Sequence, residues 1–498
     1  MNIPHSISYQ LIMTLILSTL LAGCTVGPDF KRPPPPEVET YTSTPIVLGE
    51  SQRFSEKGED NQQWWHELGS PKLNALIDEA LSANPTLAGA RATLRQANEL
   101  YVAQAGSSLY PQVGANVGGQ RQRSNPSVSG QSGDGQEFSL YSTSVSVHYT
   151  FDLVGGSRRA LESLAAQVDY QGFQLEGARL TLLADIVTGA VTLARLADQI
   201  QATEAILRSQ EEQLAMTREG VRLGQIAPDA VLAIQTQVEQ TRASIPSLRN
   251  QLQQNEHLLA VLVGRAPGTG GLPFFSLREF TLPVDLPLTV PSVLVRSRPD
   301  IQAAEALLHA ANAEYGVAIA QLYPQLTLSA NLGSQALTTG ALFGSDSAIW
   351  SLVGQLTQPL FSPGLPAQKR AALAAFDAAA ANYRMVVLES LRSVADVLRA
   401  LENDAQRLTA LSAAHAAAQG ALESIQRQYG LGSVSYVNLL IAQEQVQQVR
   451  IALIEAQAHH LIESSAAFYQ AMGGGKSTAG TTLVKVEPTN VPRERLIR

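Results

Sequence analysis

Three short stretches carry residue types that could do chemistry: a lone cysteine, a glycine-rich segment and two adjacent histidines. Gly473–Thr478 (GGGKST) resembles a phosphate-binding loop, but that motif requires a glycine where Gln470 stands and a preceding strand, whereas a helix is expected here. His459 and His460 lack the i, i+4 spacing of helical metal ligands, and no other histidine or cysteine is near them. We expect a helix end before a disordered tail, histidines at the surface or lining a tube, and no catalytic, cofactor or metal site.

The single cysteine, Cys24, cannot form an intrachain disulfide, and its surroundings predict lipidation. Leu11–Leu21 (LIMTLILSTLL) is too short for the about 20 residues that span a bilayer, but it suits a signal-peptide core. Leu21–Cys24 (LAGC) resembles the bacterial lipobox, in which the peptide is cut before the cysteine and the new N-terminus is acylated. Thr25, where an aspartate would favour the inner membrane, is compatible with the outer one. The alternative is an ordinary signal peptide with an incidental cysteine.

Composition excludes several classes of protein. Charged residues make up 16% of the chain, below the roughly 25% of an ordinary soluble domain. The mean hydropathy of +0.00 argues against a helical membrane protein. A net charge of -8 provides no basic field for phosphates, so we expect no nucleic-acid partner. No Ser/His/Asp arrangement stands out, and an enzyme is not indicated.

The sequence contains an internal repeat, so that the same series of helices and strands is expected twice. Each half reads helix, strand, loop, strand, long helix, turn, long helix, and the offset between the halves drifts from 214 (299 − 85) to 208 (431 − 223). The matching pairs are Asn84-Pro85 with Arg298-Pro299, Pro111 with Pro324, Leu223-Gly224 with Leu431-Gly432, Gln235 with Gln443, and Arg242 with Arg450. We divide the chain into a signal peptide (1–23), a lipidated extended arm (24–63), a first repeat (64–263), a linker (264–290), a second repeat (291–472) and a tail (473–498).

The strand segments alternate between apolar and polar residues, as in Tyr141–Asp152 and Leu326–Gly333. A soluble sandwich would give the same pattern. Strands of a transmembrane barrel are also apolar outside and polar inside over about 10 residues, with aromatics near their ends, and Tyr110, Tyr149 and Trp350 occupy such positions.

The helical segments carry apolar residues in steps of seven, which predicts coiled-coil packing. The series are Leu161 to Leu196, Val231 to Leu259, Leu373 to Leu408, and Leu439 to Leu453. Turns at Gly224–Pro228 and Gly430–Ser435 would make two long antiparallel hairpins. Ser157–Arg222, roughly 65 residues, would be on the order of 100 Å long.

Four strands cannot close a membrane barrel, because the smallest has about eight and open edges are not tolerated in lipid. Copies of the chain must therefore assemble. Three copies would provide twelve strands and twelve long helices; strand arithmetic alone would also permit a dimer.

Specific strings in both halves resemble the TolC-like outer-membrane efflux proteins, in particular the lipoproteins that serve resistance-nodulation-division (RND) pumps. They are WWHELGSPKLNALIDEALSANPTL, SRPDIQAAEALLHAANAEYGVAIAQLYPQLTLSANLG and the doubled hairpin turns, and the match runs from Cys24 to about Gly475. The resemblance implies a mixed α/β membrane protein: a homotrimer with a twelve-stranded outer-membrane β-barrel, continued by a long α-helical coiled-coil barrel in the periplasm. It also implies a periplasmic adaptor, an inner-membrane RND-type transporter and no cofactor besides lipid on Cys24.

The resemblance further implies that the hairpin ends close the tube. Tyr429 matches the family's linking tyrosine, and Gly432 matches the turn glycine, with Gly224 as its counterpart in the first half. The two acidic positions of the constriction fall on Asn438 and Ile441, and the linking arginine falls on Val434, so this sequence departs from the family pattern.

A constriction without those acids must close differently. We expect a ring of Asn438 or Leu439 to close it sterically, with Asp229 as its charge. The alternative is that these are ordinary hairpin-end residues that cap and pack.

The sequence thus predicts a passive exit duct for drugs or other small molecules. Two alternatives remain: a type I protein-secretion duct, and a structural coiled-coil lipoprotein without a pore.

Overall fold

The computed structural model describes residues 25–49, 52–55, 62–123, 135–225 and 227–474. The expected signal peptide, Cys24 and the segment after Gly474 lie outside the described residues. The chain divides into two compact units, each assembled from three stretches of sequence. Unit 1 comprises Met1–Pro33, Thr93–Gln171 and Ala304–Tyr383, and unit 2 comprises Pro34–Ala92, Gly172–Ala303 and Arg384–Arg498.

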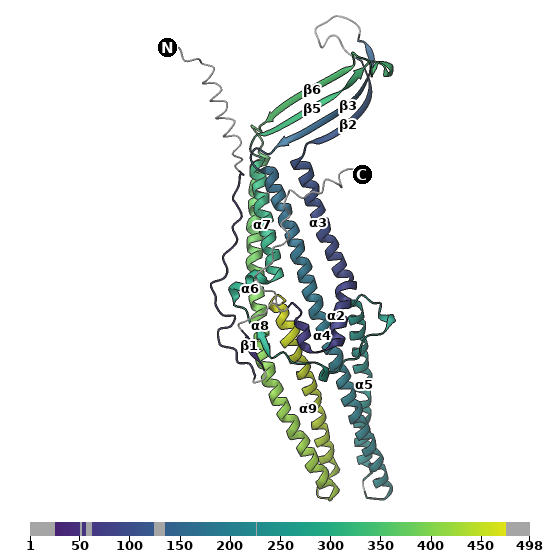
Figure 1. The fold of residues 1–498 in the computed structure, drawn as a ribbon. Coiled ribbons are helices and arrows are strands. Elements are labelled where there is room, and N and C mark those ends of the chain that lie inside the picture. The colour runs from purple at the N-terminus through teal and green to yellow at the C-terminus, as the bar shows by residue number, and fades with distance from the viewer. Residues whose placement is uncertain (1–24, 50–51, 56–61, 124–134, 226, 475–498) are drawn as a thin grey trace. The chain divides into compact units, whose positions relative to one another are not determined.

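The internal repeat is confirmed, because the same order of elements occurs twice (Figure 1). The first copy is α3 (Pro85–Leu109), β2 (Gln112–Arg123), β3 (Glu137–Phe151), α4 (Gly156–Arg222) and α5 (Pro228–Leu262). The second is α7 (Pro299–Ala320), β5 (Gln325–Ala336), β6 (Ala348–Thr357), α8 (Gly364–Gly430) and α9 (Tyr436–Ile462). Shorter elements are β1 (Arg53–Ser55), η1 (Trp64–Leu68), α2 (Pro71–Ala83), η3 (Pro267–Thr269), η4 (Leu277–Glu279), β4 (Asp285–Pro287), α6 (Pro291–Ser297), η5 (Thr339–Ala341), the π-helical η6 (Glu463–Ala467) and α10 (Phe468–Ala471).

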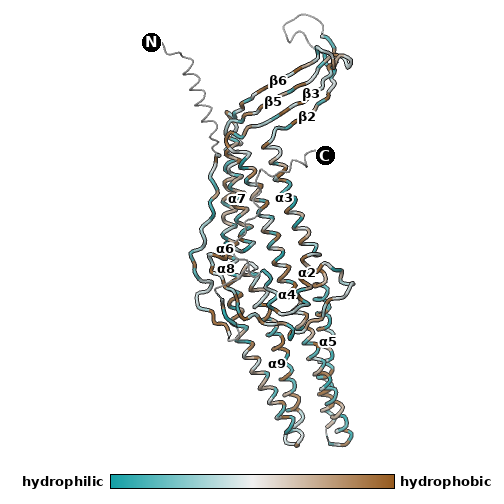
Figure 2. Tube along the Cα trace, viewed as in Figure 1, coloured by the Kyte–Doolittle hydropathy of each residue, from teal (hydrophilic) through white to brown (hydrophobic). Residues whose placement is uncertain are grey.

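The four long strands form one antiparallel sheet in unit 1, in the order β2-β3-β5-β6. The two halves of the chain meet where β3 pairs with β5, and Phe151 lies opposite Leu326 in that register. Figure 2 shows hydrophobic and hydrophilic residues alternating along these strands. The sheet therefore has two chemically different faces, as the alternation predicts.

The helices α4 and α8 are each 67 residues long, on the order of 100 Å at about 1.5 Å per residue. Each contains a stretch apolar enough to cross a membrane, but both helices are far longer than the about 20 residues that a membrane span needs. Alanine, leucine, arginine and glutamine are the commonest residues of both helices, and all four favour helix. The heptads indicate that the apolar residues serve helix packing, since the paired helix follows directly after a short turn.

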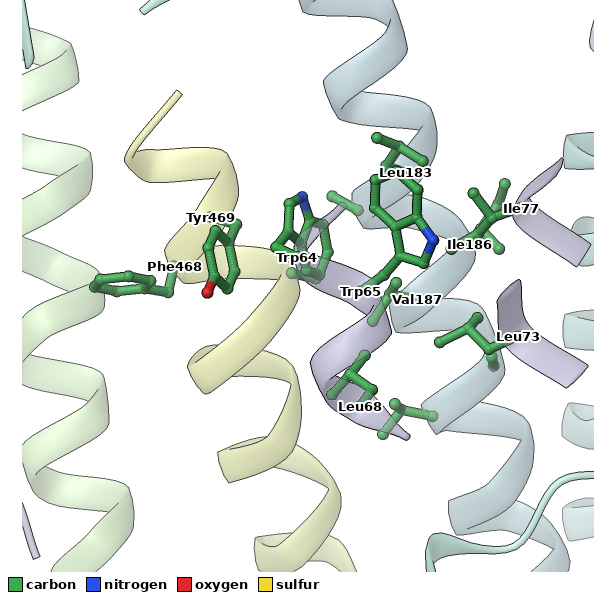
Figure 3. Close-up of a cluster of buried hydrophobic side chains, with 14 of the residues drawn as sticks. Trp64, Trp65, Leu68, Leu73, Ile77, Leu183, Ile186, Val187, Phe468 and Tyr469 are labelled. Atoms are coloured by element: carbon green, nitrogen blue, oxygen red, sulfur yellow. The ribbon is translucent and has the colours of Figure 1, made fainter. Parts of the chain in front are cut away.

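The core of unit 2 is built around two tryptophans of η1 (Figure 3). Trp64 stacks on Tyr469 of α10 with ring centroids 4.9 Å apart, and Trp65 meets Trp64 edge to face. Leu183 and Ile186 of α4 belong to the same buried cluster. The WWHEL string is therefore a packing element, which ties the start of the first repeat to the end of the second.

Candidate functional site

The sheet of unit 1 presents one apolar and one polar face. The apolar face carries the odd-numbered residues of β2 and β3 and the even-numbered residues of β5 and β6, because the register places these opposite one another. Val145, Leu332 and Trp350 lie in one such row and are exposed in the single chain. An exposed apolar face of this size needs lipid or a partner to cover it.

The polar face carries hydroxyl, amide and glycine residues over most of its length, including Ser142, Ser144 and Ser146 on β3. The strands have 12, 15, 12 and 10 residues, enough for the about 9–11 residues that a tilted strand needs to cross a bilayer. Such strands can place one face toward lipid and the other toward water.

The two helical hairpins in unit 2 end in the same local structure. Gly224 and Gly432 both have positive φ angles, 70° and 71°, which cost a glycine little. At the first end Gly224 N donates to Val221 O, and at the second Gly432 N donates to Tyr429 O. These bonds satisfy carbonyls that the helix end leaves open.

The expected constriction residues all lie near these hairpin ends. Asp229 is exposed in the first turn of α5, where a negative charge also suits the helix dipole. Asn438 is exposed in the first turn of α9, whereas Leu439 is buried, with 6% of its surface accessible. The structure therefore leaves the side chains of Asp229 and Asn438 accessible and packs that of Leu439 within unit 2.

The sequence did not predict a hydrogen bond that joins the two hairpins. Tyr436 opens α9, and its hydroxyl donates to Gln213 Oε1 of α4 at 3.1 Å. Its ring lies against Tyr429, with centroids 5.6 Å apart, and packs on the buried cluster of Leu214, Ile234 and Val238. Burial raises the pKa of Tyr436 to about 12, so the phenol stays protonated at physiological pH.

Comparison of the two repeats gives one weak indication that Tyr436 has a special role. With the offset of 208, the first-half counterpart of Tyr436 is Pro228, which only begins a helix. The tyrosine therefore marks a position at which the halves diverge. Tyr429, expected as the linking residue, contributes its ring to the cluster through Tyr436.

The SRPD string of the second repeat has a structural role in unit 2. Arg298 pairs with Asp300 at 2.7 Å and donates to the carbonyl oxygen of Ala471 at 2.7 Å. Burial alone would raise the pKa of Asp300, but Arg298, the Ile301 amide and the Ser390 hydroxyl together hold it below its ordinary value. The string fixes the end of α10 to the start of α7.

The arm after Cys24 is fixed to unit 1 by Arg159, a buried arginine of α4. Arg159 donates to Asp29 Oδ1 and Glu162 Oε2, both at 2.7 Å, and to the carbonyl oxygens of Val26 and Gly27 at 3.3 Å. These contacts attach the residues next to Cys24 close to the junction of β3 and α4. We call this set the arm clamp.

A second contact extends the arm clamp. The ring of Phe30 stacks on His309 of α7, with centroids 4.4 Å apart, and His309 Nε2 lies 2.8 Å from Glu162 Oε1. Further along the arm, in unit 2, Tyr41 donates to Thr289 O at 2.6 Å, and β1 pairs in parallel with β4.

The expectation for the adjacent histidines was wrong for one of them. His459 is exposed, and its Nδ1 lies 2.5 Å from Asp404 Oδ2. His460 is buried, with 2% of its surface accessible, and burial lowers its pKa. Consecutive helical residues point about 100° apart, so the two rings face different surroundings.

Comparison with known proteins points to one family. A family model described as outer membrane efflux protein matches residues 76–265 and 290–474. The toluene efflux pump outer membrane protein TtgC of Pseudomonas putida is 28% identical over 472 residues, which are 94% of this chain and 96% of that protein. The pyoverdine export outer membrane protein OpmQ of Pseudomonas aeruginosa is 30% identical over 428 residues, 84% of this chain and 88% of that protein.

A solved structure agrees with these sequence relatives. That of the outer-membrane channel OprN has a TM-score of 0.82 and 28% sequence identity, and covers 91% of this chain and 99% of that chain. The mixed α/β fold, with one four-stranded antiparallel sheet per chain, is thereby confirmed.

Proposed function

This chain belongs to the outer membrane efflux protein family and is an outer-membrane efflux channel; on that premise we propose how it conducts. Three copies close their sheets into a twelve-stranded barrel, and the helical hairpins line the passage on the periplasmic side. The observation that carries the proposal is the two-faced sheet with β2 and β6 at its edges.

The edges of the sheet require more copies. Among the described strands, β2 and β6 each pair on one side only. An unpaired backbone group in lipid costs several kcal/mol, so β6 of one copy pairs with β2 of the next. Three copies provide twelve strands, and the apolar face then meets lipid while the polar face lines the passage.

Passage through this channel is passive, and a pump elsewhere supplies the energy. We infer that a periplasmic adaptor and an inner-membrane RND-type transporter deliver the cargo, since relatives of this chain are named as parts of efflux pumps. Their names refer to toluene and to pyoverdine. Small molecules are therefore favoured over proteins as cargo.

Lipid on Cys24 would hold the channel at the membrane surface. The arm clamp supports this proposal, because it fixes residues 26–29 within unit 1, beside the end of β3. An acylated N-terminus at that place would insert its chains into the same membrane that the strands cross, and each buried methylene would contribute about 0.8 kcal/mol.

The test is conductance in planar lipid bilayers. The purified protein should form pores, and Asp229→Ala combined with Asn438→Gly should raise the conductance by removing exposed side chains at both hairpin ends. Pores of unchanged conductance would contradict the role given to these two residues. A protein that forms no pores would contradict the proposed function as a whole.

A further inference from the structure

The polar face of the sheet carries no acidic or basic side chain except one histidine. This face comprises the even-numbered residues of β2 and β3 and the odd-numbered residues of β5 and β6. Within these described strands, none of those positions is Asp, Glu, Lys or Arg, and His148 is the one residue with a basic side chain. Arg121, Arg123 and Glu137 belong to the opposite face.

The neighbours of His148 are neutral on every strand that packs against it. Gln112 of β2 and Ser329 of β5 lie opposite it in the register, and Ser146 and Thr150 flank it on its own strand and face. His148 Nδ1 lies 3.1 Å from Ser329 Oγ. A hydroxyl can both donate and accept, so this contact is compatible with a neutral and with a protonated ring.

We propose that His148 is a selectivity-determining residue, which gives the barrel a positive lining in acid and a neutral lining at alkaline pH. The proposal rests on the trimeric channel described above. His148 is exposed and lies three positions before the end of β3 at Phe151. Each copy thus adds one switchable charge near the helix-side end of an otherwise uncharged sheet, where every permeating ion or charged small molecule passes.

The diameter of the barrel determines whether the three histidines can share a metal ion and how far their charges act across the passage. Twelve strands about 4.8 Å apart and tilted by about 40° give a backbone diameter on the order of 25 Å. The Cα atoms of the three histidines are then on the order of 20 Å apart and their inward-pointing imidazoles on the order of 15 Å apart, too far to share a metal ion at about 2 Å. Salt at 0.15 M screens charges beyond about 8 Å, but at 0.01 M the screening length is about 30 Å and reaches across the passage.

The experiment measures ion selectivity in planar bilayers at low salt, under a potassium chloride gradient, at pH 7.5 and pH 5.5. For the wild-type channel the chloride-to-potassium permeability ratio should rise by about sevenfold on acidification, because a lining potential of one kT favours chloride and disfavours potassium by about 2.7-fold each. His148→Gln should abolish this rise. His148→Lys should give the high ratio at both pH values.

The control is His257→Gln, which removes an exposed histidine on α5 and should leave the pH response intact. An equal response in wild type and His148→Gln would overturn the proposal while leaving the channel function in place. Loss of the response in His257→Gln alone would also overturn it. Absence of any wild-type conductance would overturn both the channel function and the role of His148.

Discussion

At the scale of single residues, the hairpin ends are joined by a contact that no local pattern reveals. Tyr436 bonds a buried glutamine, Gln213, more than two hundred positions earlier in the chain. Buried polar partners of this kind cost more when broken than they contribute when formed. The pair is therefore suited to hold the two hairpins of one copy together.

Replacing Tyr436 with Phe should loosen the hairpin ends, because it removes the hydroxyl and leaves the Gln213 amide oxygen without that donor. A net hydrogen bond of about 1 kcal/mol corresponds to about fivefold in the equilibrium between closed and open ends. Single-channel recordings should show a correspondingly higher open probability.

The matched control is Tyr429→Phe, since Tyr429 contacts Tyr436 through its ring, which phenylalanine retains. If both variants behave alike, or if Tyr436→Phe stays as closed as wild type, the bond between Tyr436 and Gln213 does not restrain the ends.

At the scale of elements, the arm clamp shows how an extended segment without a core of its own can be held. Arg159 is buried and bonds two carboxylates and two backbone carbonyls. The neighbouring Arg158 is more exposed and pairs with Asp152 at 3.2 Å. The two adjacent arginines of α4 therefore differ in role: Arg159 holds the arm, whereas Arg158 forms a more exposed ion pair.

Changing Arg159 to Gln should release the arm, because it removes the only cationic partner that Asp29 has among the described residues. The Asp29 carboxylate is exposed, so this ion pair alone contributes at most about 1 kcal/mol, but the variant also loses the hydrogen bonds to the carbonyl oxygens of Val26 and Gly27, about 1 kcal/mol each. Arg158→Gln should stay within about 0.5 kcal/mol. Trypsin cleavage at Lys31, followed by mass spectrometry, reports the release. Equal cleavage of both variants would show that Arg159 does not hold the arm.

Periodicity sufficed to predict the elements, but not their contacts. Alternation and heptads are local, so they located β3, β5 and the four long helices, and the drifting offset revealed the repeat. Tyr436 with Gln213 and Arg159 with Asp29 join positions far apart in sequence, and no local signal specifies such pairs. Likewise, His459 and His460 differ in burial because of what each helix face meets.

At the scale of the whole molecule, the central claim is that the chain works only as an assembly. One copy leaves both sheet edges and a whole apolar face uncovered. Lipid can cover the apolar face, but the unpaired backbone groups of the edges cannot persist in lipid. In such an assembly each of the three copies contributes the same residues to the lining of the passage.

The most direct test is the mass of the detergent-extracted particle, combined with low-resolution electron microscopy. We predict a particle of three copies, hollow along its three-fold axis. A monomer, or a three-copy particle with a solid centre, would contradict it and would favour a structural coiled-coil lipoprotein without a pore.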